Sequence, residues 1–366
     1  MNGDRILITG GAGFIGSNLI RIMIENYQII CLDRISYATN PRSLEDLTNT
    51  IFLPRGYPEP KRTGGMRLLP LQILPSDRLI FIAGSVNDPE LVSSLLSHVS
   101  GVIHLAAWTH VDRSLVDPGP FLENDLMGTY TLLEALRREK GIRLLHVSTD
   151  EIYGSLREGV FTEESPINPS SPYAVSKAAA DRLVFTYHQA YGLEAMIVRP
   201  ANNYGPYQHI EKFIPFMITS GLKGLKLYLY GDGRNVRSWI YVEDCARAIR
   251  MVYEKGKVGG IYNIPGIIDL ENRKVAESVC QILNLSLDRI EYIKDRPLHD
   301  FRYAMEGKRI RSLGFIPKVS IEEGLDRTVE WYCNNRDWWQ ELWDEDFEDY
   351  VKEWYGGLGA GSIAES

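Results

Sequence analysis

The chain has few cysteines, no long apolar run and no excess of basic residues. Its four cysteines, Cys31, Cys245, Cys280 and Cys333, lack C-x-x-C spacing, so we expect free thiols in a reducing compartment. No apolar stretch approaches the ~18 residues that span a bilayer, and a strand-like run at Arg5–Thr9 leaves no room for a signal peptide. We therefore expect a cytoplasmic protein with no membrane partner. The net charge of −8 argues against nucleic acid as a general partner.

Short apolar runs alternate with segments of helical periodicity through the first two thirds of the 366 residues. The runs predict strands at Arg5–Thr9, Ile29–Asp33, Leu79–Ala83, Val102–Ala106, Arg143–Ser148 and Ala195–Arg199. Apolar residues at 3.6-residue spacing predict helices at Gly16–Glu25, Pro89–Leu96, Gly128–Arg138 and Pro172–Tyr191. This alternation indicates an α/β fold of Rossmann type, a doubly wound parallel sheet with helices on both faces.

Three regions break the alternation. Residues 54–78 are rich in proline and basic residues, which predicts a surface insertion that is either a functional flap, a mobile excursion or simply tolerated. From 201 to 340 the elements shorten, as expected of a smaller α/β substrate-binding lobe after a Rossmann domain over 1–200, with the chain crossing between the two. Residues 341–366 form an aromatic and acidic segment with a glycine-rich end that we expect to be flexible. Five tryptophans near the C-terminus either pack on the body or bind a partner: Trp331, Trp338, Trp339, Trp343 and Trp354.

A glycine-rich turn follows the first predicted strand. In Gly10-Gly11-Ala12-Gly13-Phe14-Ile15-Gly16 the glycines allow a tight turn and close approach of the backbone to a pyrophosphate, at a helix N-terminus that offers N–H donors. Asp33 ends the second strand, where a carboxylate can hold the ribose hydroxyls and repel a 2′-phosphate. The turn and Asp33 together predict NAD rather than NADP; Arg34 weakens that preference without reversing it.

A tyrosine and a lysine lie four residues apart on a predicted helix. Tyr173 and Lys177 therefore face the same way, and the cation would favour the phenolate form of the tyrosine. Such a tyrosine is a base for a substrate hydroxyl during oxidation by a nicotinamide cofactor.

Two adjacent acids follow the strand that ends near Ser148. Thr149, Asp150 and Glu151 lie at a carboxyl strand end, which in open parallel sheets faces the ligand crevice. Like charge and partial burial would separate the two pKa values, giving one acid and one base for the same substrate. Redox chemistry alone needs no such pair, whereas an elimination does.

These motifs closely resemble those of the nucleotide-sugar 4,6-dehydratases of the extended short-chain dehydrogenase/reductase superfamily. The resemblance runs from Arg5 to about Trp339, apart from the insertion. It includes the glycine turn, the blocks at 104–107, 110–114 and 128–135, the Thr-Asp-Glu triplet, Tyr173 with Lys177, and the blocks at 202–208, 230–244 and 295–303. The triplet discriminates, because related epimerases and decarboxylases usually carry other residues there.

The resemblance implies a complete reaction on dTDP-glucose or UDP-glucose. Tyr173 would remove the 4-hydroxyl proton while NAD takes the C4 hydride, and Thr149 would polarise the new ketone. Glu151 would then remove the C5 proton, and Asp150 would protonate the departing 6-hydroxyl. Hydride return to C6 would give a 4-keto-6-deoxy sugar. The alternatives are another nucleotide-sugar enzyme, such as a 4-epimerase or decarboxylase, or a non-catalytic NAD-binding regulator.

The resemblance also implies the binding residues and a homodimer formed by the helices at 128–138 and 172–191. NAD contacts are expected from Gly10, Gly13, Phe14, Ile15, Gly16, Asp33, Arg34, Ser85, Val86, Ala106, Ala107, Tyr173 and Lys177. The nucleotide sugar is expected at Thr109, Thr149, Asn202, Lys212, Arg237, Arg296 and His299, and no metal is expected. The sequence departs from the family pattern at several positions: Trp108-Thr109 replaces a usual Glu-Ser, and Ser85 replaces a frequent aspartate. Ser238, Leu298 and the segment 263–269 also differ from the usual residues.

Overall fold

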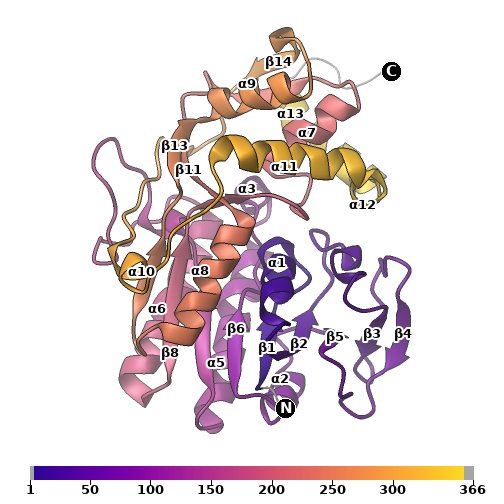
Figure 1. The fold of residues 1–366 in the computed structure, drawn as a ribbon, viewed down its shortest axis with the longest axis vertical. Coiled ribbons are helices and arrows are strands. Elements are labelled where there is room, and N and C mark those ends of the chain that lie inside the picture. The colour runs from indigo at the N-terminus through magenta and orange to yellow at the C-terminus, as the bar shows by residue number, and fades with distance from the viewer. Residues whose placement is uncertain (1–3, 358–366) are drawn as a thin grey trace.

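A nine-stranded parallel sheet is the framework of the protein, of which the computed structural model describes residues 4–357 (Figure 1). Its strands, in spatial order, are β12 (Ile261–Ile264), β8 (Ala195–Pro200), β7 (Arg143–Val147), β6 (Gly101–His104), β1 (Arg5–Thr9), β2 (Gln28–Asp33), β5 (Leu79–Ala83), β3 (Thr50–Leu53) and β4 (Arg67–Pro70). Every neighbouring pair in this sheet is parallel. The strand order reverses beside β1, which is typical of a doubly wound fold, and the predicted fold class is confirmed.

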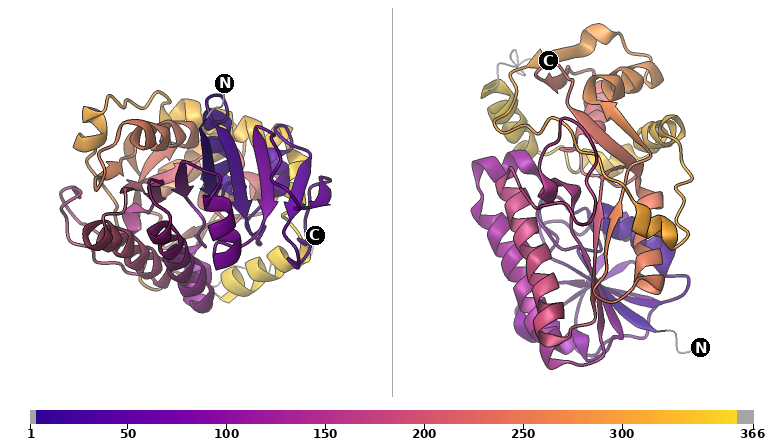
Figure 2. Two further views of the ribbon diagram at one scale, coloured as in Figure 1. Left: turned by 90° about the horizontal axis from the view of Figure 1, so that it is seen from below. Right: turned by 90° about the vertical axis from the view of Figure 1, so that its left-hand side faces the viewer.

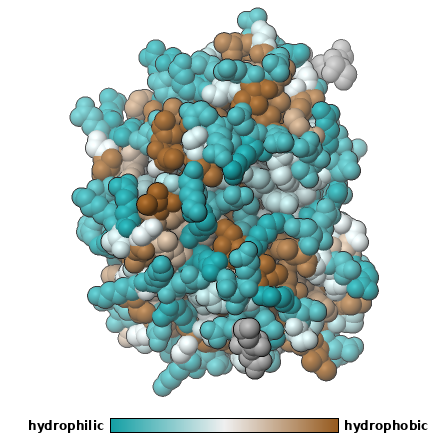
Figure 3. Space-filling model, viewed as in Figure 1, coloured by the Kyte–Doolittle hydropathy of each residue, from teal (hydrophilic) through white to brown (hydrophobic). Residues whose placement is uncertain are grey.

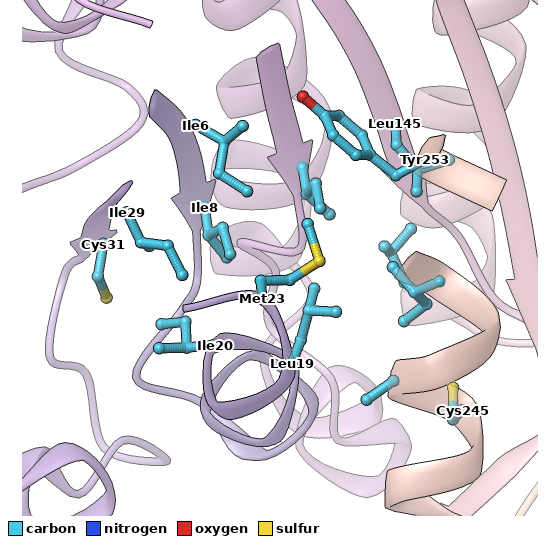
Figure 4. Close-up of a cluster of buried hydrophobic side chains, with 14 of the residues drawn as sticks. Ile6, Ile8, Leu19, Ile20, Met23, Ile29, Cys31, Leu145, Cys245 and Tyr253 are labelled. Carbon is cyan, nitrogen blue, oxygen red and sulfur yellow. The ribbon is translucent and has the colours of Figure 1, made fainter. Parts of the chain in front are cut away.

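Helices cover both faces of this sheet (Figure 2). Side chains alternate along β1, so Ile6 and Ile8 pack with α1 (Phe14–Met23) and α8 (Val242–Lys255), whereas Leu7 packs with the opposite layer. Figure 4 shows the first of these cores, in which Leu19, Ile20 and Met23 of α1 lie against β1 and β2. The opposite layer consists of α2 (Pro89–Leu96), α5 (Gly128–Arg138) and α6 (Pro172–Tyr191).

The bounds of α2 and α6 are those predicted, because the chain carries local start and stop residues there. Asp88 accepts hydrogen bonds from the first N–H groups of α2, and Ser171 does the same for α6. A proline follows each cap, at a position where the missing N–H costs nothing. Gly192 then ends α6 with a φ of 70°, a left-handed conformation that glycine adopts without strain.

A smaller lobe lies at the carboxyl ends of the strands of the large sheet (Figure 1). Its two small sheets contain β13 (Ile268–Glu271), β11 (Val236–Tyr241) and β9 (Asn202–Tyr204), and β10 (Leu227–Tyr230) with β14 (Ile290–Ile293). Its longer helices are α7 (Phe213–Leu222), α9 (Asn272–Ile282), α11 (Ile321–Asn334) and α13 (Glu345–Gly357). The shorter helices of the chain are α3 (Val111–Val116), α4 (Gly119–Phe121), α10 (Lys308–Ser312), α12 (Arg336–Gln340), the 3₁₀ turns η1 (Pro41–Leu44), η3 (Asp150–Tyr153) and η4 (Leu287–Arg289), and the π-helical segment η2 (Leu122–Met127). The chain returns to the large sheet through α8 and β12, so the smaller lobe is not one continuous segment.

The Pro-rich segment 54–78 contains more structure than its composition predicts. Its residues 67–70 form β4, which pairs in parallel with β3 and so makes the edge of the large sheet. Pro70 is the last residue of this edge strand, where no further strand needs a hydrogen bond from the missing N–H. Arg62, from the same segment, pairs with Asp344 and donates to the backbone oxygen of Tyr37 at 3.1 Å. The insertion therefore contacts the C-terminal segment.

The C-terminal tryptophans pack against the body of the protein. Trp338 and Trp339 are buried, and Nε1 of Trp339 donates to the backbone oxygen of Tyr332 at 2.9 Å. Most of the glycine-rich end lies beyond Gly357, outside the described residues. Figure 3 shows a mostly hydrophilic face on which hydrophobic residues form small separate groups. Among the helices of residues 4–357, none is long and apolar enough to cross a membrane.

Candidate active site

A cavity runs along the carboxyl ends of β1, β2, β6 and β7 and contains every residue expected to contact NAD. Its wall includes the glycine turn, Asp33, Arg34, Ser85, Val86, Ala106, Ala107, Tyr173 and Lys177. Thr149, Asp150 and Glu151 line the same cavity, as do Thr109, Asn202 and Lys212. Parallel strands bring these residues together because each strand ends at the same edge of the sheet.

The glycine turn leaves room for a pyrophosphate. Gly10 has a φ of 68°, and a Cβ there would lie 2.7 Å from the backbone nitrogen of Ala106. A Cβ on Gly13 would meet within 4 Å only Gly10 O, among the described atoms, so a side chain there would project into the cavity. Gly13 is also the N-cap of α1, and no described side chain caps this helix. Its first N–H groups are therefore free to bind phosphate oxygens.

Asp33 is held firmly at the cavity wall. Its Oδ2 accepts from Ala12 N at 3.1 Å, and its Oδ1 accepts from Ile35 N at 2.9 Å and from the hydroxyl of Thr39 at 3.3 Å. Burial raises its pKa, while these hydrogen bonds oppose the rise. Arg34 donates instead to the side chain of Asn124 at 2.7 Å, so its guanidinium is already engaged. This arrangement fits a ribose with a free 2′-hydroxyl.

The electrostatic environment of Tyr173 differs from the one that the sequence predicts. Lys177 donates from Nζ to the backbone oxygen of Val147 at 2.8 Å, and burial lowers its pKa. The pKa of Tyr173 is raised well above its usual value by burial and then by Glu151 and Asp125. Burial and these two carboxyl groups therefore oppose the expected phenolate in the protein alone.

The adjacent acids lie in different electrostatic environments. Thr149 caps η3 by accepting from Glu151 N at 3.3 Å, and its hydroxyl donates to Asp150 Oδ1 at 3.2 Å. Burial and then Glu151 raise the pKa of Asp150 to about 8. Burial also raises the pKa of Glu151, but Arg296, Lys212 and Arg237 lower it. At neutral pH, Asp150 therefore holds a proton while the three cations favour the ionised form of Glu151.

A second cavity continues from the first into the smaller lobe. Glu151, Thr109, Asn202 and Lys212 line both cavities, and Arg237, Arg296 and His299 line the second. All the residues expected to bind the nucleotide sugar therefore lie on one continuous surface.

The cations of the second cavity are placed to meet an anion. Arg296 pairs with Asp112, yet its Nε is buried without a hydrogen-bond partner in residues 4–357. Arg237 lies 4.5 Å from the ring centre of Tyr303 and is buried. His299 shares a hydrogen bond at Nδ1 with Asp295. Burial, and then the charges of Arg296 and Arg237, lower the pKa of His299 to about 4, so its ring is neutral at neutral pH. The unpartnered guanidinium N–H is suited to a diphosphate oxygen.

Comparisons with known proteins agree with this site. A model of the "NAD dependent epimerase/dehydratase family" matches residues 6–265. The chain belongs to this family. Among curated members, it is 39% identical over 346 residues to the dTDP-glucose 4,6-dehydratase of Streptomyces niveus, covering 92% of this chain and 95% of that one. It is also 39% identical to the Mycobacterium tuberculosis dTDP-glucose 4,6-dehydratase, over 93% of this chain and 96% of that one.

Solved structures of family members have the same fold. A dTDP-glucose 4,6-dehydratase from Streptomyces venezuelae with NAD bound is 40% identical with a TM-score of 0.83, covering 92% of this chain and 99% of that one. A UDP-glucose 4-epimerase from Thermus thermophilus, also with NAD, is 28% identical with a TM-score of 0.77, covering 90% and 99%. The resemblance to nucleotide-sugar 4,6-dehydratases is thus confirmed, and NAD is the cofactor of this family.

Several residues that no sequence motif singled out also line the two cavities of this family member. Asn124, Asn203, Gln208 and His209 line the first, and Asp112, Phe216, Tyr228, Tyr230, Trp239, Tyr303 and Tyr355 line the second. Asp112 and Tyr230 belong to sequence blocks that carry the resemblance, which was a usable signal. Tyr355 follows no motif, and only the path of the folded chain brings it to the cavity.

Proposed function

We propose that this chain is an NAD-dependent hydro-lyase, a dTDP-glucose 4,6-dehydratase. The observation that carries the proposal is that Thr149, Asp150, Glu151 and Tyr173 line one cavity together, and that Glu151 also lines the second. An enzyme that only oxidises and reduces needs one proton-transfer group, whereas this site offers a base, a second base and an acid. Elimination of water from an oxidised sugar uses all three.

NAD fits the first cavity. The free N–H groups of α1 would hold its pyrophosphate, Asp33 its adenosine ribose, and Tyr173 with Lys177 its nicotinamide end. When bound, NAD supplies a hydride acceptor that later returns the hydride, and its oxidised ring supplies a positive charge. That charge would oppose the rise in the pKa of Tyr173.

Oxidation at C4 depends on Tyr173 and Thr149. Tyr173 takes the proton of the 4-hydroxyl, and the Thr149 hydroxyl hydrogen-bonds the same oxygen. A ketone at C4 then acidifies the proton on C5. Both residues line the cavity, and the Thr149 hydroxyl also lowers the pKa of Tyr173 by hydrogen bonding to it. This contact favours the phenolate against the burial of the ring.

Elimination across C5 and C6 depends on the acid pair. Glu151 is the base that takes the C5 proton: burial raises its pKa, and three neighbouring cations oppose that rise and favour its ionised form. Asp150 is the acid that protonates the 6-oxygen as the C6–O bond breaks, and its raised pKa keeps that proton available at neutral pH. One proton is taken and one is given, so water leaves without a net change in charge, and Glu151 would give its proton back to C5 when the hydride returns to C6.

The second cavity would bind the rest of the nucleotide sugar. Arg237 and Arg296 are the proposed diphosphate ligands, with Lys212 and His299 beside them. Thr109 and Asn202 line the junction of the cavities, where the glucosyl ring would lie. The side-chain oxygen of Asn202 is buried and unpartnered among residues 4–357, so it can accept a hydrogen bond from a sugar hydroxyl.

Separate incubation with dTDP-glucose and UDP-glucose, in the presence of NAD, tests the function. The expected result is a 4-keto-6-deoxy product from dTDP-glucose and less or none from UDP-glucose. Formation of the C4 epimer without loss of water would indicate a 4-epimerase, and loss of carbon dioxide from a uronic acid substrate would indicate a decarboxylase. Stabilisation by NAD with no turnover of any sugar would favour a non-catalytic regulator and refute the proposal.

We further propose that the protein is a homodimer through α5 and α6. These helices pack side by side on the outside of the large sheet (Figure 2), and Met127, Tyr130, Val175 and Tyr191 are exposed on or beside them. A four-helix interface would cover these side chains. Sedimentation of the Tyr130→Glu variant as a monomer is the expected result.

The four cysteines are free thiols, which fits the cytoplasmic location that we propose.

A further inference from the structure

The acid pair lies on a single 3₁₀ turn that the rest of the protein must hold in place. This turn, η3, has only 4 residues, Asp150–Tyr153, and one such turn has little stability of its own. Its last residue, Tyr153, is buried and stacks on Phe161, with ring centres 4.9 Å apart and an interplanar angle of 16°. Tyr153 therefore anchors the end of the turn that carries Asp150 and Glu151.

The Tyr153 hydroxyl belongs to a buried hydrogen-bond network. It donates to Asn263 Oδ1 of β12 at 2.8 Å and accepts from Arg199 Nη1 of β8 at 2.7 Å. The same guanidinium donates from Nε and Nη2 to the two oxygens of Asp181, at 2.9 and 2.7 Å. Arg199 and Asp181 are 1% and 0% exposed. Because a planar guanidinium meets a carboxylate in one paired geometry, this network fixes the direction of each of its members.

The network connects the two elements that carry the proposed chemistry. Tyr173, Lys177 and Asp181 recur every four residues on α6, so their side chains share one face of that helix. Arg199 therefore joins α6, through Asp181, to η3, through Tyr153. The residues of the network line neither of the two cavities. They can act on a substrate only through the residues that do.

We propose that Tyr153 and Arg199 are positioning residues: they hold the acid pair of η3 at a fixed distance from Tyr173. This inference rests on the proposed function, because it assumes that one bound sugar is oxidised with Tyr173 and dehydrated by the acid pair. The sugar presents its 4-hydroxyl, C5 and 6-hydroxyl to these groups without leaving the site. A misplacement of about 1 Å can cost about 10²-fold in rate, so the spacing of η3 and α6 decides how fast the oxidised sugar loses water.

Tyr153→Phe tests this role, because it removes the hydroxyl and keeps the ring that stacks on Phe161. Arg199 stays paired with α6, while η3 loses its connection. When the NAD-loaded full-length variant is mixed rapidly with dTDP-glucose, reduced nicotinamide should form within about three-fold of the wild-type rate. Its decay, which reports water loss and hydride return, should slow by about 10–10²-fold, so that reduced nicotinamide accumulates. KM should change less than about two-fold, since the hydroxyl lines neither cavity.

Two further variants sharpen the measurement. Asn263→Leu removes the other partner of the hydroxyl and leaves its bond with Arg199, so it should show the same slow decay to a smaller extent. It decides the question if Tyr153→Phe does not fold. Tyr262→Phe is the matched control, because this neighbouring buried tyrosine accepts from Lys257 N at 2.8 Å, outside the network. Both phases should keep their wild-type rates in the control. NAD affinity and the thermal midpoint show whether each variant is folded.

Three results would overturn the inference. Wild-type decay of reduced nicotinamide in folded Tyr153→Phe and Asn263→Leu would mean that the network does not hold the acid pair. Slower formation with normal decay would mean that the network acts on Tyr173 alone. Equal slowing of both phases would mean a general disturbance of the site rather than a misplaced acid pair. Failure of the proposed function is distinguishable, because wild type would then give no 4-keto-6-deoxy product.

Discussion

Replacing Asp150 with asparagine isolates the acid step of the elimination. The carboxyl lies at the cavity wall, and its Oδ2 is buried without a partner in the described chain. With a pKa of about 8, about nine-tenths of the molecules hold the proton at neutral pH. Asparagine keeps the shape and a hydrogen-bond donor but has no proton to give. General acids contribute about 10²–10⁴-fold, so water loss should slow by that factor.

A substrate with a different leaving group shows whether the slower rate of Asp150→Asn is due to the missing proton transfer. With fluoride in place of the 6-hydroxyl, departure needs little help from an acid, so Asp150→Asn should lose about ten-fold or less. For wild type, kcat/KM with dTDP-glucose should fall as the pH rises through about 8, because the protonated carboxyl is the active form. The variant should lack this fall. Equal losses with both substrates, or an unchanged alkaline fall, would refute the assignment of Asp150 as the acid.

Three other substitutions test separate parts of the site. Glu151→Gln should still oxidise the sugar, seen as absorbance of reduced nicotinamide, yet release no 4-keto-6-deoxy product; water loss at the wild-type rate would exclude Glu151 as the base. Gly13→Val should weaken NAD binding at least ten-fold in calorimetry while the fold is retained by circular dichroism, because the side chain would enter the cavity; unchanged affinity would place the pyrophosphate elsewhere. Burial raises the pKa of Asp125 to about 7. The protonated carboxyl therefore contributes stability to the folded protein that is fully present below about pH 4 and is lost as the pH rises through about 7. Between about pH 5 and about pH 9, the free energy of unfolding in urea should therefore fall by on the order of 3 kcal/mol more in wild type than in Asp125→Asn. Equal falls in both proteins would mean that the buried carboxyl is not the cause.

Local chemistry explains which parts of the fold could be predicted. The bounds of α2, α5 and α6 are those predicted, and β1 and β5 also match residue for residue. A capping side chain and a proline mark the starts of α2 and α6, although α5 has neither, and continuous apolar runs mark strands buried on both faces. Strand β4 was missed because Arg67–Pro70 has no apolar run of its own. Its strand state depends on pairing with β3, which no local pattern reveals.

The same distinction applies to the site. Residues that follow a strand or open a helix, such as Asp33 and Glu151, could be placed because parallel topology fixes where strand ends lie. Tyr355 could not, since its place in the second cavity depends on the packing of α13 against α7 and the small sheets. The direction of the Tyr173 pKa was also missed. The sequence shows the nearby lysine, but it does not show the burial of the ring or the two carboxyl groups near it, which raise the pKa.

The charges around Tyr173 imply that the proton transfers are coupled. An ionised Glu151 raises the pKa of Tyr173, and Glu151 in turn raises the pKa of Asp150. When Tyr173 accepts the 4-hydroxyl proton, a negative charge near Glu151 disappears, so Glu151 becomes a weaker base than it was beside a phenolate. A C5 proton becomes acidic enough for a carboxylate only beside a ketone at C4, so the chemistry of the sugar requires oxidation before elimination. The coupling of Tyr173 with Glu151 acts in the same direction, because the loss of the phenolate charge makes Glu151 a weaker base.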